Sequence, residues 1–283
     1  MSTGRSCFEL RGARVDVLHP AGWADLVRGL LPALATTSPE AAPVTATLRF
    51  ESDPAGGWVV RGPAVGSPTP AVEAAAALTL LEASIVEVLV GAVAGVIPLH
   101  AAAFEAAGRA VVLAGPSGSG KSTLAAAAAR TGAPVLGDDV VLLDPADGRV
   151  LPVPRPFKVE GPAVALLGLD PPSDPRAPLR PDPAQLGAAW SRGAPLGLLA
   201  LTGVRPGGAP VAMEPLDAAD AIPAVLRQIA RAGPLAGPDF TALADALDAV
   251  LRVRVRFADP GAAVRALAAL VEPEAGASRA RIR

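Results

Sequence analysis

A glycine-rich octapeptide near the middle of the chain constrains the fold more than any other feature. Its sequence, Gly115-Pro116-Ser117-Gly118-Ser119-Gly120-Lys121-Ser122, fits the pattern G-x-x-x-x-G-K-[ST] without a mismatch. The apolar run before it, 110–114, is typical of a buried strand, and the alanine-rich run after it, 122–130, is typical of a helix that stops at Gly132. A strand, a glycine loop and a helix in this order direct backbone N–H groups toward an anion, so the stretch predicts a phosphate-binding loop.

The residues of this stretch have distinct expected roles. In a loop of this pattern the lysine, here Lys121, contacts the β- and γ-phosphates of a nucleotide, and the hydroxyl of the next residue, Ser122, binds Mg²⁺. We therefore predict that the chain uses ATP and Mg²⁺. The candidate nucleotide-binding residues are Gly115, Pro116, Ser117, Gly118, Ser119, Gly120, Lys121, Ser122 and Thr123.

The composition restricts the classes of partner and site. The 283 residues carry a net charge of −2, which gives no long-range attraction to nucleic acid or to an anionic membrane. Cys7 is the only cysteine, and the two histidines are His19 and His100, so an internal disulfide, a thiolate metal cluster and a histidine-rich metal site are excluded. These features favour a cytoplasmic protein.

One apolar segment, 88–104, comes near the length of a membrane-spanning helix. It contains two glycines and Pro98, and Glu82 and Glu87 lie just before or at its start, so we interpret it as buried core. The first ten residues also lack the apolar stretch of an export signal. We expect no membrane association.

The pattern of apolar residues divides the chain into three parts. Residues 1–70 are expected to form a small β-rich region, with a strand over 44–50, a hairpin into a strand from Trp58, and a further strand at 14–17. Residues 71–272 are expected to form the domain that carries the glycine loop, and 273–283 a disordered tail. A helix over 71–97 is expected to pack on the second domain.

Strands and helices are both expected in the second domain. Pro223 fits a helix around 222–229 only in its first turn, and the proline-rich stretch 170–183 is expected to be a flap or a linker. The expected strands are 99–104, 110–114, 135–143, 196–204 with 211–213 as its neighbour, and 252–257; further helices are expected around 240–251 and 264–271.

Two adjacent carboxylates, Asp138 and Asp139, interrupt the apolar strand expected over 135–143. Neighbouring residues of a regular strand point to opposite faces, so both carboxylates reach one site only at a bend or a strand end, and Gly137 allows such a bend. One carboxylate would then hold Mg²⁺ while the other accepts a proton from an attacking hydroxyl. The alternative is that one aspartate is solvated and only the other binds metal.

His100 is expected at the end of the strand that precedes the glycine loop. A lone histidine beside an apolar run is more often a hydrogen-bonded core residue than a catalyst, but the spacing here is specific. His100 precedes Lys121 by 21 positions, and the pair beginning at Asp138 follows Lys121 by 17. With this arrangement the chain resembles the bacterial HPr kinase/phosphorylase family and its looser relatives, which share a P-loop core with the phosphoenolpyruvate carboxykinases.

The resemblance covers mainly residues 100–143 and implies a fold and a set of roles. The implied fold is α/β, with a P-loop kinase core of the HPr kinase/phosphoenolpyruvate carboxykinase type over 71–272 and a small β-rich region before it. By the same resemblance Asp138 is the catalytic base, His100 is its supporting partner, Lys121 serves the phosphoryl transfer, and Ser122 and Asp139 are the magnesium ligands.

The chain departs from the family at two places. The family's second signature, an acidic-arginine-glycine stretch downstream of the Asp pair, is not found, and the corresponding region reads Arg155-Pro156-Phe157-Lys158-Val159-Glu160. Pro116 also stands where the regulators usually have aspartate. These departures argue against HPr as the substrate. The likeness is closer to the HPr-kinase-like proteins that accompany peptide-modifying gene clusters, some of which phosphorylate a serine of a precursor peptide.

Several cations have two interpretations each. Arg155 or Lys158 would either neutralise charge on the transferring phosphoryl group or be a surface cation beside a proline turn. Arg252, Arg254 and Arg256 share one face of an expected strand, and they would either hold an acidic substrate or form a solvated strand edge.

The resulting hypothesis is an ATP- and Mg²⁺-dependent kinase that phosphorylates a serine or threonine hydroxyl of a peptide or small protein. Two alternatives stay open. One is a kinase of a small hydroxyl metabolite such as free serine, and the other is an inactive nucleotide-binding partner protein in a biosynthetic complex. The sequence leaves open whether the protein forms a homo-oligomer and whether pyrophosphate replaces ATP.

Overall fold

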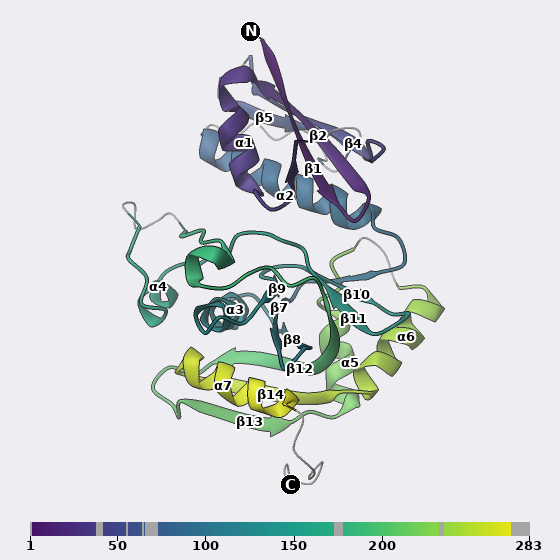
Figure 1. Cartoon of the computed structure of the whole chain (residues 1–283), viewed down its shortest axis with the longest axis vertical. Coiled ribbons are helices and arrows are strands. Elements are labelled where there is room, and N and C mark those ends of the chain that lie inside the picture. The colour runs from purple at the N-terminus through teal and green to yellow at the C-terminus, as the bar shows by residue number, and fades with distance from the viewer. Residues whose placement is uncertain are drawn as a thin grey trace. The chain divides into compact units, whose positions relative to one another are not determined.

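The computed structural model of the chain describes residues 2–37, 42–54, 56–63, 65, 73–172, 178–231 and 235–272 (Figure 1). It is a mixed α/β structure that divides into two compact units, Met1–Ala94 and Gly95–Arg283. The first contains a five-stranded sheet and the second a nine-stranded sheet. The α/β class expected from the sequence is therefore confirmed, while the expected tail 273–283 lies outside the described residues.

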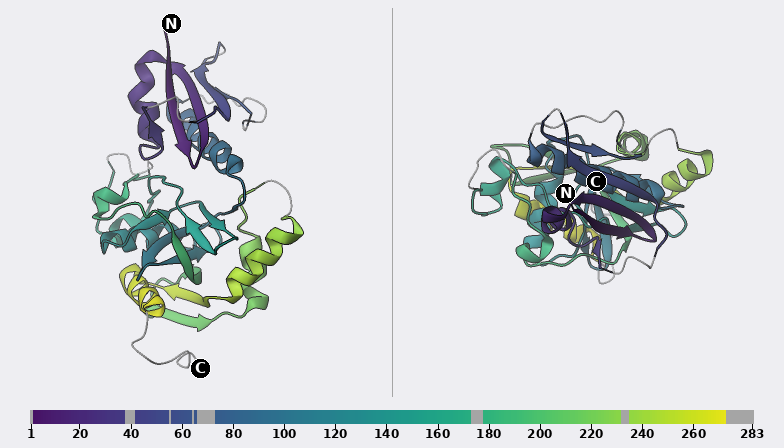
Figure 2. Two further views of the ribbon diagram at one scale, coloured as in Figure 1. Left: turned by 45° about the vertical axis from the view of Figure 1, so that its right-hand side comes forward. Right: turned by 90° about the horizontal axis from the view of Figure 1, so that it is seen from above.

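The sheet of the first unit is built around an antiparallel hairpin, visible in Figure 2. Strands β1 (Thr3–Leu10) and β2 (Ala13–Pro20) are joined by Arg11 and Gly12, which both have positive φ angles, as a two-residue turn of the favoured hairpin type requires. Strand β4 (Ala46–Ser52) pairs parallel to β2 and antiparallel to β5 (Trp58–Arg61), which confirms the hairpin expected to lead into the strand from Trp58. The short strand β3 (Ala35–Thr36) pairs with β1.

The described residues of this unit also form two α-helices, α1 (Ala24–Leu30) and α2 (Ala74–Ala92). A 3-10 turn over Ala21–Trp23 precedes α1. The sequence assigns the second helix to the following domain, whereas in the structure α2 belongs to the first unit, where it contacts β1, β2, β4 and β5. On its apolar face, Leu81, Ile85 and Leu89 are fully buried. The first unit therefore extends to Ala94 rather than to residue 70.

Helix α2 is the only helix of the described chain that is long and apolar enough to cross a membrane. Length and composition alone are a weak indication of a membrane span, because core helices meet the same criterion. The segment 88–104 is not a single helix, since it runs from the end of α2 into the strands β6 (Ile97–Leu99) and β7 (Ala102–Ala106).

The nine-stranded sheet positions the residues of interest. Its middle contains β8 (Arg109–Ala114), β12 (Ala194–Val204) and β14 (Leu251–Phe257), which pair in parallel. Strand β7 pairs antiparallel with β8, and β9 (Val135–Gly137) pairs with β7. On the other side of β12, β11 (Arg149–Leu151), β10 (Val141–Asp144) and β6 follow in antiparallel order.

Helices cover both faces of this sheet (Figure 1). On one face α3 (Lys121–Arg130) packs against α7 (Pro260–Val271), and the core between them and the strands contains the alanine row of α3. On the other face lie α5 (Ala218–Leu226) and α6 (Gly237–Asp248). Two further short helical segments are described, α4 (Pro162–Leu166) and a 3-10 turn over Pro183–Leu186. The 3-10 turn lies at the end of the proline-rich stretch 170–183, of which residues 173–177 lie outside the described chain.

Three expectations about elements are corrected. Pro223 lies inside α5 rather than in its first turn; the helix is short, starts at the capping residue Asp217, and already ends at Leu226. The strand β13 (Val211–Pro215) pairs with β14 and not with the 196–204 strand. The strand expected over 135–143 is two strands, β9 and β10, which pair with different neighbours.

The arginine row on β14 is not a strand edge, because β14 lies between β12 and β13. Each of the three arginines faces a carboxylate: Arg254 lies 3.8 Å from Asp220, for example. The other pairs are Arg252 with Asp248 at 3.1 Å and Arg256 with Glu214 at 3.0 Å. This row is therefore neutralised within the chain, which leaves no support for a role in holding an acidic substrate.

Candidate active site

The glycine loop connects the end of β8 to the start of α3, as its sequence predicts. Gly118 and Gly120 have φ angles of +76° and +90°, in the left-handed region that favours glycine. A Cβ atom on Gly120 would lie 2.5 Å from Cζ of Phe257, so the loop also packs too closely on β14 to admit a side chain there. Because the residue before α3 is a glycine, no side chain caps the first N–H groups of this helix. These groups are the usual partners of an anion.

A buried threonine on the adjacent strand fixes the loop. Thr202 of β12 shares a hydrogen bond of 2.9 Å between its Oγ1 and Oγ of Ser119, and its hydroxyl lies 3.2 Å from the carbonyl oxygen of Ala114. Sequence reasoning missed Thr202, because a contact across 83 positions leaves no local pattern. Only the parallel pairing of β8 with β12 reveals it.

Lys121 is folded onto the loop. Its ammonium Nζ donates to the carbonyl oxygens of Gly115 at 2.8 Å and Pro116 at 3.2 Å, and the residue is only 7% exposed. Burial lowers the pKa of Lys121, while the charges of Asp139 and Asp138 act in the opposite direction. The two aspartates and the loop lysine are therefore close enough to interact electrostatically.

The two carboxylates lie where the chain leaves β9 and enters β10. A Cβ atom on Gly137 would lie 2.4 Å from the carbonyl oxygen of Val140, so the tight turn between the strands requires glycine. The bend expected at this position is thereby confirmed. Asp138 and Asp139 stand outside regular strand structure, and the charges of both act on Lys121 of the glycine loop.

Asp138 is the buried member of the pair, with 3% of the residue exposed. One oxygen, Oδ2, accepts the backbone N–H of Lys158 at 2.9 Å, whereas the other, Oδ1, is buried without a hydrogen-bond partner in the described chain. Burial raises the pKa of Asp138 to about 6, opposed chiefly by the hydroxyl of Ser122 and by the N–H of Lys158. The guanidinium of Arg155 also lowers this pKa, but more weakly than these two hydrogen bonds do.

Asp139 is the accessible member, with 40% of its side chain exposed. Its Oδ1 lies 3.2 Å from Nδ1 of His100, and its Oδ2 lies 2.5 Å from the guanidinium of Arg155. His100 therefore contacts Asp139 and not Asp138, which corrects the expectation that it supports Asp138. Arg155 lies in the site, whereas the ammonium of Lys158 points to Glu160 at 2.9 Å on the surface.

The residues predicted from the sequence thus come together, with Arg155 added to them. Three separate stretches of the chain supply these residues, which meet at one end of the sheet. The stretches contain His100, then Lys121 with Ser122, then Asp138 with Asp139. Gln228, which sequence reasoning also missed, reaches the same place from the turn after α5. No single pattern in the sequence links Gln228 to the loop.

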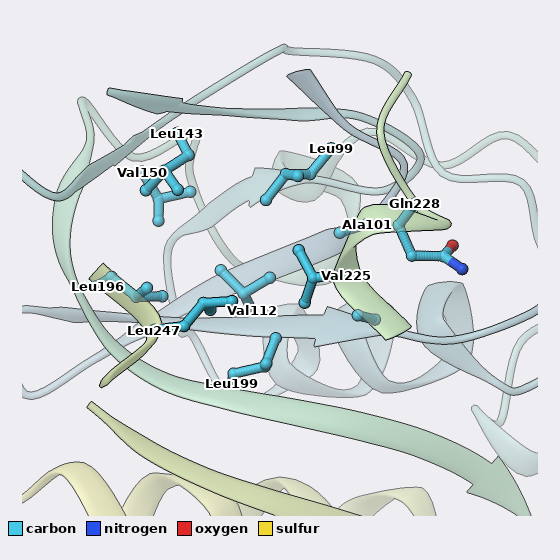
Figure 3. A pocket seen from close by; sticks show the side chains of 11 residues that line it. Leu99, Ala101, Val112, Leu143, Val150, Leu196, Leu199, Val225, Gln228 and Leu247 are labelled. Atoms are coloured by element: carbon cyan, nitrogen blue, oxygen red, sulfur yellow. The ribbon is translucent and has the colours of Figure 1, made fainter. Parts of the chain in front are cut away.

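An apolar cavity, which Gln228 lines at its edge, lies on the α5 and α6 side of the sheet (Figure 3). Apart from Gln228 its walls are aliphatic, and it contains no charged side chain, so it does not suit a nucleotide or a small polar acceptor. Its lining residues are Leu99, Ala101, Val112, Ala114, Leu143, Val150, Leu196, Leu199, Val225, Gln228 and Leu247.

Comparison with known proteins adds no assignment. None of the protein-family models matches the chain, and no curated protein sequence matches it.

Proposed function

We propose that this protein is an ATP- and Mg²⁺-dependent kinase that transfers the γ-phosphoryl group to a serine or threonine hydroxyl of a peptide or small protein. The observation that carries the proposal is the meeting of an intact glycine loop with the Asp138-Asp139 pair at a strand break. A P-loop kinase core of the HPr kinase type is part of this proposal.

The loop residues suit the donor side of the reaction. The uncapped N–H groups at the start of α3 and the ammonium of Lys121 would bind the β- and γ-phosphates. For this Lys121 must leave the carbonyl oxygens of Gly115 and Pro116, on which it now rests. The exchange replaces neutral acceptors with charged ones, which form stronger hydrogen bonds.

The residues present fit a magnesium ion. Oδ1 of Asp138 is a buried carboxylate oxygen without a partner in the described chain, and the hydroxyl of Ser122 lies beside the same carboxylate. Oxygen donors of this kind are what Mg²⁺ prefers, and it commonly uses one or two protein ligands together with phosphates and water. When bound, the ion would supply charge neutralisation on the phosphoryl oxygens. The described residues contain no cluster of three or more metal-binding side chains, which such a site does not need.

The surroundings of the two carboxylates support the reverse of the roles that the family resemblance implies. Asp138, beside Ser122, is the better magnesium ligand, while Asp139 is the carboxylate that an acceptor can reach from solvent. Geometry is the first requirement for a general base, and accessibility favours Asp139. His100 and Arg155 would hold Asp139 in place, and Arg155 would also lie near the developing negative charge.

The reaction then proceeds as a direct displacement. The acceptor oxygen forms a bond to the γ-phosphorus, the bond from that phosphorus to the β–γ bridging oxygen breaks, and Asp139 takes the hydroxyl proton. ADP leaves with the bridging oxygen. Catalysis comes mostly from positioning and charge stabilisation.

The exposure of the site favours a macromolecular acceptor. His100 and Asp139 have 43% and 40% of their side chains exposed, as expected for residues that meet a peptide at an open surface. A kinase of a free metabolite would be expected to enclose its substrate, and the cavity of Figure 3 is apolar. Free serine is therefore the second candidate acceptor, to be tested beside peptides.

The decisive experiment is transfer of label from γ-labelled ATP, with Mg²⁺, to serine-containing peptides and to free serine. We expect peptide labelling that falls at least a hundredfold in Asp139→Asn with ATP affinity nearly unchanged, and a loss of ATP affinity in Lys121→Ala. Asp138→Asn should weaken the binding of Mg²⁺, so that more Mg²⁺ is needed for transfer. It should also raise the free energy of unfolding of the ligand-free protein by about 1 kcal/mol, because it removes a buried charge.

Other results would redirect the proposal. Labelling of free serine but not of peptides would identify the metabolite kinase. Tight ATP binding with label on no acceptor would support the inactive partner protein. Transfer at the full rate in Asp139→Asn would exclude Asp139 as the base and return that role to Asp138.

A further inference from the structure

Gln228 is fixed to the site by its own backbone. The peptide after α5 runs antiparallel beside the end of β6, where the N–H of His100 donates to the carbonyl oxygen of Gln228 at 2.5 Å. The N–H of Ala230 donates to the carbonyl oxygen of Pro98 at 2.9 Å, and Ile229 pairs with Leu99 between them. The backbone of Gln228 is therefore held beside that of His100.

The side chain of Gln228 points away from the leucines of the apolar cavity (Figure 3). Its amide faces two carbonyl oxygens, that of Gly115 at 3.1 Å and that of His100 at 3.2 Å. An amide oxygen in this place would face two acceptors, so the hydrogen-bond network assigns the nitrogen to this side, where it donates to both. Gln228 thus bridges the first residue of the glycine loop and the histidine of the candidate site.

The carbonyl oxygen of Gly115 is shared. It accepts from Nζ of Lys121 at 2.8 Å as well as from Gln228. Gly115 is buried, and a buried carbonyl left without a donor costs free energy. When Lys121 turns to a phosphate, Gln228 is the donor that stays with this carbonyl.

We infer that Gln228 is a positioning residue that keeps the Gly115 carbonyl hydrogen-bonded while Lys121 moves to the phosphates of the nucleotide. This inference rests on the proposed function, since it needs a phosphate in the loop. Loss of the Gln228 side chain should therefore destabilise the nucleotide-bound protein more than the free protein. In the free protein Lys121 compensates for its loss.

The test compares Gln228→Met and Gln228→Glu with the wild-type protein and with Arg227→Ala, a change at the exposed neighbouring residue. Methionine keeps the length of the side chain without the donor, and glutamate places acceptors against the two carbonyls. We expect Mg·ATP to bind about tenfold more weakly to Gln228→Met, and more weakly again to Gln228→Glu. Without ATP, Gln228→Met should unfold near the wild-type temperature, and Arg227→Ala should bind ATP normally.

A double-mutant cycle in the ligand-free protein supplies a second readout. Lys121→Met and Gln228→Met remove one donor each from Gly115, and together they remove both. We expect the double variant to be less stable than the sum of the single changes predicts, because only it leaves the buried carbonyl unpaired. Additive changes would contradict the shared carbonyl.

The outcomes separate the two proposals. A wild-type protein that does not bind Mg·ATP would overturn the proposed function. A wild-type protein that binds it, together with Gln228 variants that bind it equally well, would overturn the inference alone. Gln228→Met that loses stability without ATP but keeps its ATP affinity would show a structural role only.

Discussion

At the scale of single residues, the glycine loop shows two separate reasons for glycine. Gly118 has a positive φ, but a Cβ atom there would meet no atom within 4 Å. Gly120 has a positive φ and also lies against Phe257 and Val204 of the neighbouring strands. The first position needs only backbone freedom, whereas the second also needs space.

This difference predicts unequal effects of alanine. Gly118→Ala should cost about 1 kcal/mol of stability and leave ATP binding measurable, because only the left-handed conformation is strained. Gly120→Ala should cost roughly 2–4 kcal/mol and abolish ATP binding, because the loop must also move away from Phe257. Chemical denaturation and ATP titration of both variants measure these effects. Equal losses in the two variants would show that close packing at Gly120 is unimportant.

At the scale of elements, the arginine row of β14 connects a strand to the helices around it. Arg254 and Arg256 form single, largely exposed ion pairs with Asp220 and Glu214. Arg252 is more buried, and its guanidinium also donates to the carbonyl oxygen of Leu247 near the end of α6. A cation at this end of a helix satisfies terminal carbonyls and interacts well with the helix dipole.

The row therefore predicts graded effects on stability. Arg252→Ala should destabilise the protein by about 1–2 kcal/mol, because it removes the contacts at the end of α6 as well as an ion pair. Arg254→Ala and Arg256→Ala should each cost between about 0 and 1 kcal/mol, as exposed ion pairs do. Thermal unfolding measures the three changes. Loss of peptide phosphorylation in the stable Arg254→Ala variant would revive a role in substrate binding.

At the scale of the whole molecule, the chain keeps its two sheets in separate units. Every residue of the candidate site belongs to the unit Gly95–Arg283, which has buried clusters on both faces of its own sheet. The first unit buries its own apolar residues between its sheet and helix α2. Each unit thus has a core of its own.

This division predicts that a fragment of residues 95–283 folds and binds Mg·ATP with the affinity of the full chain. A fragment that starts at residue 71 should be less soluble, because it carries α2 without the sheet that covers its apolar stripe. Circular dichroism, light scattering and ATP titration of the two fragments provide the measurements. If only the longer fragment folded, α2 would have to contribute to the second unit.

The sequence by itself determined the local features of this protein. The glycine loop, its strand and its helix were predictable because their signals lie within about twenty consecutive residues. The bend at Gly137 was predictable because neighbouring side chains of a regular strand point to opposite faces, so two adjacent carboxylates reach one site only where the strand bends. The strand expected over 44–50 was predictable because apolar and polar residues alternate there, which is also a local signal.

Tertiary structure alone decided which partners these features have. An apolar helix stripe does not specify which sheet it covers, so α2 was assigned to the wrong unit. The contacts of His100 and Arg155 with Asp139, of Thr202 with the loop, and of Gln228 with Gly115 depend on strand pairings between distant segments. Hydrogen bonds and ion pairs act over a few ångströms in space, and only the folded chain brings such residues within that range.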